Sequence, residues 1–315
     1  MGMIRKNTME DQGMQESFYG WYMKCQSHTG TLAVIPAVHC ARHQKTCSVQ
    51  LITDDSAYTA WFPGKAFSRR GKNISIGDNH FSQRGMVLSV DKPGLSVKGR
   101  LRFGPLTPLR YDIMGPFALV PFMECRHHVW SMRHRVLGTV CVNGRNYSFQ
   151  NETGYWEGDS GRSFPKEYVW TQCLFPQGSL MLAVAEIPVA GMHFTGIIGA
   201  VLWKGREYRL ATYLGARLAA VRNGIVQIAQ NDMRLKARLL KRAAQPLKAP
   251  VTGDMTRTIH ESAACTAYYR FQKAGQTLFA FESPQASFEY EYPIISPTAV
   301  SSSRLPILPG SGRSV

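Results

Sequence analysis

Two acidic residues, Glu157 and Asp159, lie two positions apart in the segment GYWEGDSGRSFPKEYVWTQC, residues 154–173. In an extended chain, alternate residues face the same side. Two close carboxyls disfavour each other's ionisation, so one of the two can stay protonated and serve as an acid. Alternatively, both carboxylates accept backbone N–H bonds or pair with Arg162 and Lys166. The pair is therefore a candidate proton donor, with a structural role left open.

A third candidate acid is Glu186, the only charged residue in SLMLAVAEIPVAG, residues 179–191. Strand alternation places Glu186 on one face with Leu180, Leu182 and Val184. A carboxyl on the apolar inner face of a barrel is poorly hydrated and weakly ionised, which prepares it to donate a proton. Alternatively, this face is exposed, or an arginine across the sheet pairs with Glu186.

Three histidines, His127, His128 and His134, fall within RHHVWSMRH, residues 126–134. Even spacing places His128, Trp130, Met132 and His134 on one face of a strand. These histidines could orient a substrate group or accept its proton, or they could be half-buried sheet residues. No third ligand has recognisable spacing, so we expect no metal site and no other cofactor.

The central segment also carries large side chains that could line a cavity for an apolar ligand. The alternative is that they belong to a packed core, as most tryptophans in β-barrels do. These predicted wall residues are Tyr155, Trp156, Tyr168, Trp170 and Gln172.

Short alternating runs, interrupted by Gly, Pro, Asn and Asp, predict strands joined by tight turns, with little helix. Asn143-Gly144 between two apolar runs is a strong hairpin signal. Within residues 232–248, basic and aliphatic residues alternate, which favours a strand over a short helix. A dozen or more strands exceed one eight-stranded barrel, so the fold class is all-β with two tandem barrels or sandwiches.

Four regions follow from this organisation. We expect a disordered N-terminus over residues 1–16, β domains over 17–160 and 161–295, and a flexible tail over 296–315 that is rich in Ser, Pro and Gly.

The composition excludes several classes of protein. With 44% hydrophobic and 18% charged residues, the 315-residue chain is neither disordered, collagen-like nor a coiled coil. Seven cysteines without a CxxC pair favour a reducing compartment. The start is polar, and no apolar stretch reaches the roughly 18 residues of a spanning helix. We therefore expect a cytoplasmic protein.

The net charge of +16 predicts an anionic partner. Residues 209–248 hold nine Lys or Arg and one acid, Asp232. No stacking aromatics accompany these charges and no nucleic-acid-binding motif is visible, so we expect no nucleic-acid partner. A basic outer sheet face could instead hold the protein near an anionic membrane. No obligate protein partner is evident.

The segment GYWEGDSGRSFPKEYVWTQC resembles the signature of the tocopherol cyclase family. CRHHVWSMRHRVLGTV (125–140) is also similar to that family, and APVTGDMTRTIHES (249–262) resembles it more loosely. The resemblance implies two lipocalin-like (calycin) β-barrels, related to carotenoid hydratases. Glu157 stands where the GYxDHxWG segment of those hydratases has Asp, Gly158 where it has His, and Ser160 where it has Trp.

The resemblance also implies a reaction that needs neither a redox cofactor nor a metal. An alkene of a prenylated hydroquinone is protonated, and the phenolic oxygen captures the carbocation. The sequence thus predicts an acid-catalysed intramolecular cyclase working in an apolar barrel cavity, with Glu186, Glu157 or Asp159 as donor. A non-catalytic carrier of a hydrophobic ligand and an isoprenoid hydratase remain alternatives.

Overall fold

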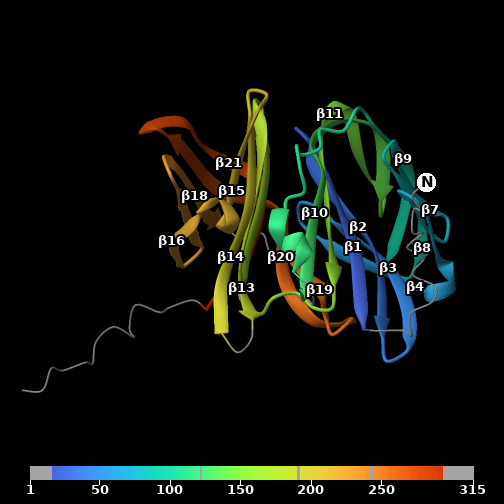
Figure 1. Cartoon of the computed structure of the whole chain (residues 1–315). Coiled ribbons are helices and arrows are strands. Elements are labelled where there is room, and N and C mark those ends of the chain that lie inside the picture. Colours follow the sequence, from blue (N-terminus) through green and yellow to red (C-terminus); the bar gives the residue numbers. More distant parts are fainter. Residues whose placement is uncertain (1–15, 121–122, 190–191, 242–244, 294–315) are drawn as a thin grey trace, which may run out of the picture.

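A computed structural model describes residues 16–120, 123–189, 192–241 and 245–293, and these residues form two antiparallel sheets (Figure 1). The all-β prediction is confirmed. The first sheet contains β1 (Ser17–Ser27), β2 (Gly30–Ala41), β3 (Gln44–Ile52), β4 (Ala57–Pro63), β5 (Phe67–Arg70), β6 (Asn73–Ile76), β7 (Asn79–Ser82), β8 (Gly85–Lys92), β9 (Leu95–Phe103), β10 (Cys125–Val142) and β11 (Arg145–Gly161).

The second sheet follows the first in the chain, and β19 joins it by pairing with β20. Its strands are β12 (Tyr168–Phe175), β13 (Gly178–Val189), β14 (Met192–Trp203), β15 (Arg206–Ala211), β16 (Arg217–Arg222), β17 (Ile225–Gln230), β18 (Met233–Lys241), β19 (Gln245–Val251), β20 (Asp254–Lys273) and β21 (Gln276–Tyr290).

Both sheets curl in the same way, because in each one the two edge strands are consecutive in the chain. A short 3₁₀ helix, η1 (Gly64–Ala66), joins the edge strands β4 and β5, and η3 (Thr212–Leu214) joins β15 and β16. A short link between the two edges holds them near each other and bends the sheet around its own interior. The remaining 3₁₀ helix, η2 (Gly115–Leu119), lies between β9 and β10.

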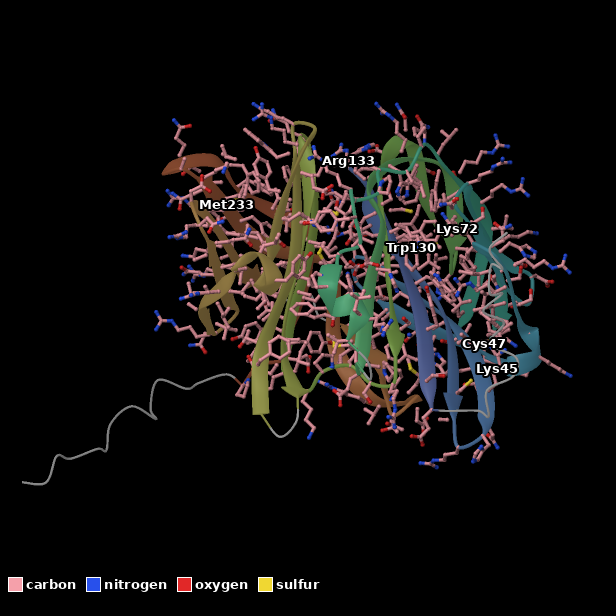
Figure 2. The ribbon with its side chains drawn as sticks, in the orientation of Figure 1. Lys45, Cys47, Lys72, Trp130, Arg133 and Met233 are labelled. Atoms are coloured by element: carbon pink, nitrogen blue, oxygen red, sulfur yellow. The ribbon has the colours of Figure 1, made fainter. Side chains whose placement is uncertain are left out.

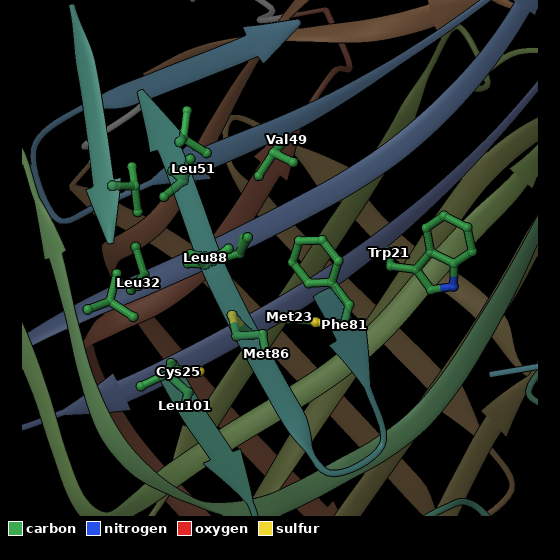
Figure 3. Close-up of a cluster of buried hydrophobic side chains, with 14 of the residues drawn as sticks. Trp21, Met23, Cys25, Leu32, Val49, Leu51, Phe81, Met86, Leu88 and Leu101 are labelled. Atoms are coloured by element: carbon green, nitrogen blue, oxygen red, sulfur yellow. The ribbon is translucent and has the colours of Figure 1, made fainter. Parts of the chain in front are cut away.

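Each curled sheet encloses a core built from its own half of the chain. Trp21, Met23, Leu32 and Phe81 belong to the first core (Figure 3), and residues from Val169 to Tyr290 form the second. A third cluster mixes side chains of both sheets and fills the space between them. The cores support the prediction of two barrels, because each barrel has its own interior.

The local turn and strand predictions are confirmed where the structure describes them. Asn143 and Gly144 have φ angles of 46° and 84°, as a hairpin turn with two positive φ angles requires. Residues 233–241 and 245–251 are strands. On β18, Arg234 and Arg238 are exposed while Leu235 and Ala237 are buried, as the alternation predicts.

The first sheet ends at Gly161 and the second begins at Tyr168. Two segments nevertheless cross between the halves. Residues 104–120 reach over to the second sheet, and the β19–β20 hairpin passes beneath the first (Figure 1). The predicted ends, 1–16 and 296–315, lie outside the described residues apart from residue 16. No helix in the described ranges is long and apolar enough to cross a membrane.

Buried polar side chains join the two barrels. The Lys24 ammonium, fully buried on β1, donates to the carbonyl oxygen of Gln285 (2.7 Å) and to Oγ of Ser287 (2.8 Å) on β21. Arg133, which lies between the two sheets in Figure 2, donates to the carbonyls at Phe175 and Gly178. Each of these cations fixes the relative position of the groups that it bonds, because moving the barrels apart would leave it unpaired.

Candidate functional site

An apolar cavity lies between the two barrels. Its walls come from β1, β2, β10 and β11 of the first sheet and from β12, β13, β14, β21 and the β19–β20 hairpin of the second. The prediction of a cavity inside a barrel is wrong, because the inward-facing side chains of each sheet pack together into that sheet's own core. The outer face of each barrel instead becomes a wall of the shared cavity.

The cavity has a volume of about 180 Å³. Since one water needs roughly 10–15 Å³ of such volume, the space takes on the order of a dozen water-sized groups. A hydroxylated ring with a short isoprenoid side chain is of this size. The aromatic residues that line the cavity are Phe18, Tyr22, Phe117, Phe164, Tyr168 and Trp170.

One wall carries a histidine held between two carboxylates. Nδ1 of His127 lies 2.8 Å from Oδ1 of Asp159, and its Nε2 lies 3.0 Å from Oε2 of Glu157. All three residues line the cavity. The structure therefore brings the two predicted acids together on one face, with His127 as their shared partner.

Strand register explains why this cluster forms. In the pairing of β10 with β11, His127 lies opposite Asp159, and Glu157 lies two residues further along on the same face. Gly158 between the acids has no room for a side chain, since a Cβ there would come within 2.3 Å of the Gly20 carbonyl oxygen. The Glu-Gly-Asp sequence thus fits a strand with an acidic side and a tightly packed side.

The cluster is ionic. Burial lowers the pKa of His127, but the Glu157 and Asp159 carboxylates outweigh burial and raise this pKa well above its usual value. The imidazole is therefore an imidazolium near neutral pH. Glu157 also accepts a hydrogen bond from the Tyr155 hydroxyl. Glu157 is thus held between the His127 imidazolium and the Tyr155 hydroxyl.

A different carboxyl in the cavity is neutral. Glu289 on β21 is only 7% exposed, and burial together with the charges of Asp159 and Glu157 raises its pKa to about 8, although a hydrogen bond from the Tyr168 hydroxyl lowers it. Glu289 pairs in register with Trp170. Glu289 was not among the predicted acids, although FEYEY (288–292) places two acids on one side of an extended segment.

Glu186 lies apart from this site. It shares its face of β13 with Leu180, Leu182 and Val184, as the alternation predicts, and those three belong to the second core. Its carboxylate accepts hydrogen bonds from Thr195 (2.7 Å) and Tyr292 (3.4 Å). The β13 residues that line the cavity are Ala183, Val184, Ala185 and Ile187, and Glu186 is absent from its lining.

The prediction that His128, Trp130, Met132 and His134 share one face is wrong. Irregularities in the β10–β11 pairing between Val129 and His134 break the alternation. Trp130 accordingly packs on the first core, and Met132 joins the cluster between the barrels.

Neither of the two predicted histidines lines the cavity. The His128 side chain is 36% exposed and lies 3.8 Å from the Asp112 carboxylate. His134 is buried, with Nδ1 3.1 Å from Oγ of Ser131. The histidines that line the cavity are His127 and His39.

The remaining predicted wall residues divide into two groups. Tyr168 and Trp170 line the cavity. The other three predicted wall residues do not line the cavity. Tyr155 bonds Glu157 through its hydroxyl, and Trp156 belongs to the first core. Gln172 is fully buried on β12. Across the described ranges, no group of three His, Cys, Asp or Glu side chains has an arrangement that could hold a metal ion.

The site predicts a loss of stability at alkaline pH. Between pH 7 and 8, His127 and Glu289 retain protons in the folded state that the unfolded chain has released, so the free energy of unfolding falls as the pH rises. We expect a loss of about 2 kcal/mol over this range, measurable by urea titration. A Glu289→Gln substitution should remove about half of the loss. Equal pH dependence in the variant and the wild type would contradict the assignment.

The comparisons with known proteins show a shared fold. No family model and no curated protein matches the chain by sequence. Among solved structures, CghA bound to Sch210972 superposes with a TM-score of 0.57 at 8% identity, covering 88% of each chain. Kievitone hydratase from Nectria haematococca gives 0.55 at 9% identity, covering 88% of this chain and 90% of its own.

A Nitrosomonas europaea protein provisionally assigned as AttH gives a TM-score of 0.54 at 9% identity. The match covers 93% of this chain and 99% of that one. At such identities the likeness concerns the fold alone, and it extends over both barrels.

Proposed function

We propose that this chain is an intramolecular cyclase of tocopherol cyclase type, which closes a ring on a prenylated hydroquinone or related isoprenoid in the cavity between its barrels. The observation that carries the proposal is the position of Glu289, a buried carboxyl in an apolar, aromatic-lined cavity, where burial raises its pKa to about 8. The resemblance of residues 154–173 to that family supports the proposal. So does the shared fold of kievitone hydratase, whose name describes an enzyme that adds water to a small molecule.

In the first step Glu289 transfers its carboxyl proton to the less substituted carbon of the ligand's alkene, which leaves a tertiary carbocation and the Glu289 carboxylate. The two π electrons of the alkene form the new C–H bond. The faces of Tyr22 and Trp170, whose rings meet edge to face at 5.2 Å, offer stabilisation for the cation. The charged Glu157–His127–Asp159 cluster adds a net negative charge on the opposite wall, which also favours a cation.

In the second step a lone pair of the phenolic oxygen forms the C–O bond to the cationic carbon. The phenolic proton then returns to the Glu289 carboxylate, so the enzyme is regenerated and the product is an isomer of the substrate. Water would compete for the same cation. An apolar cavity limits that competition and favours ring closure over hydration.

The direct test is to incubate the purified protein with prenylhydroquinone carrying a single isoprene unit, which suits the cavity volume. We expect a cyclic product with the mass of the substrate and no remaining alkene by NMR. A matched control substrate has the attacking hydroxyl methylated and should give no cyclic product. A product heavier by one water molecule would identify a hydratase, and unchanged bound ligand would identify a carrier.

The pH profile of turnover provides a further prediction. Because the donor must be protonated, kcat/KM should be flat up to about pH 8, the pKa of Glu289, and should fall about tenfold per pH unit above it. The measurement is initial rate against pH at low substrate concentration. A rate that rises with pH over the same range would mean that the essential group is a base, contrary to this scheme.

A further inference from the structure

A strap crosses between the two barrels, formed by residues 104–120 after β9. Its backbone is attached to the second sheet, although the flanking strands belong to the first. The Arg209 guanidinium donates to the carbonyls of Tyr111 (2.9 Å) and Asp112 (2.7 Å), and the Tyr213 hydroxyl donates to the carbonyl of Ile113 (3.1 Å). Connections of this length in a compact domain are commonly functional.

The strap has an inner and an outer side. Met114 and Phe117 line the cavity, and the Phe117 ring packs against Phe194 at 5.9 Å and Tyr213 at 5.5 Å. In Figure 1 the η2 turns occupy the gap between the two sheets. The inner side of the strap is thus part of the candidate site.

The outer side exposes aliphatic side chains next to that site. Leu119 is 85% exposed, more than any other large hydrophobic side chain of the described residues, and Val120 beside it is 37% exposed. Leu214, which follows Tyr213, is 39% exposed. Clustered apolar side chains on a surface indicate a partner, whereas single ones do not.

We infer that the tip of the strap, Leu119 and Val120, inserts into an anionic lipid surface. Two or three aliphatic side chains bury far less than the roughly 800 Å² per partner of a stable protein interface. A shallow lipid contact needs only a few apolar groups when electrostatic attraction assists. The net charge of +16 supplies that attraction. Because Phe117 and Met114 continue the apolar surface inward, a ligand dissolved in lipid would meet the cavity at this point.

Binding to vesicles tests the inference without any measurement of turnover. We expect the wild type to cosediment with phosphatidylcholine vesicles that contain phosphatidylglycerol, and more weakly with phosphatidylcholine alone. The double substitution Leu119→Asp/Val120→Asp should weaken binding to the anionic vesicles at least about tenfold. The matched control is Leu137→Asp, since Leu137 on β10 is also exposed (52%) but lies outside the strap. It should bind within about twofold of the wild type.

A second variant tests which surface contributes more to vesicle binding, the tip of the strap or the basic outer face of the second sheet. Arg234→Gln/Lys236→Gln/Arg238→Gln removes three charges from β18 and should change affinity less than the tip variant. Hydrogen exchange on the unmodified protein should show vesicle-dependent protection at residues 115–120. Unchanged vesicle binding by the tip variant would overturn the inference. So would a tip variant that loses only self-association, which would identify a second copy as the occupant.

Discussion

A Glu289→Gln substitution should lower kcat for ring closure by about a thousandfold, within the range that general acids contribute. Glutamine has the same shape and still accepts the hydrogen bond from the Tyr168 hydroxyl, but it has no proton to give to the alkene. The value of KM should change little, because the lost interaction is made in the transition state. The measurement is steady-state turnover of prenylhydroquinone, with thermal unfolding as a check that the fold is intact.

Two comparisons make this result specific. Glu282→Gln alters an exposed residue on the same strand and should leave turnover unchanged. Tyr168→Phe removes the hydrogen bond that lowers the pKa of Glu289, so the alkaline fall in kcat/KM should move to higher pH. If Glu289→Gln retained full turnover, Glu289 would not be the proton donor. If Glu186→Gln lost as much turnover as Glu289→Gln, a carboxyl outside the cavity would be essential as well.

Local patterns were sufficient to predict the strands and the turns. Asn143-Gly144 needs two positive φ angles wherever it occurs, and alternation along residues 234–238 determines which side chains face inward whatever packs on them. The same logic correctly placed Glu157 and Asp159 on one face, because both lie within a single strand that pairs regularly around them.

These local patterns could not predict how segments far apart in the chain pack against each other. The bulges in β10 separated Trp130 from Met132, and a bulge has no simple sequence signal. Glu289 alternates with Phe288 and Tyr290, a pattern typical of a solvent-exposed polar face. Only the docking of the first barrel onto that face buries the carboxyl and makes it an acid.

A His127→Gln substitution should cost about 3–5 kcal/mol of folding free energy, the usual penalty for removing one partner of a buried ionic cluster. The imidazolium bonds Glu157 and Asp159 at 3.0 Å and 2.8 Å, and the Glu157 side chain is 3% exposed. Without the cation, two carboxylates remain close together on a largely buried wall. Urea unfolding at pH 7 measures the loss.

The adjacent histidine provides the matched control for this loss. His128→Gln alters a side chain that is 36% exposed and 3.8 Å from Asp112, and it should cost less than about 1 kcal/mol. Adding Glu157→Gln to His127→Gln should restore much of the lost stability, since it removes one of the two repelling charges. An equal loss of folding free energy for the two histidine substitutions would mean that His127 is an ordinary buried side chain. The proposed ionic cluster on the wall that faces Glu289 would then be wrong.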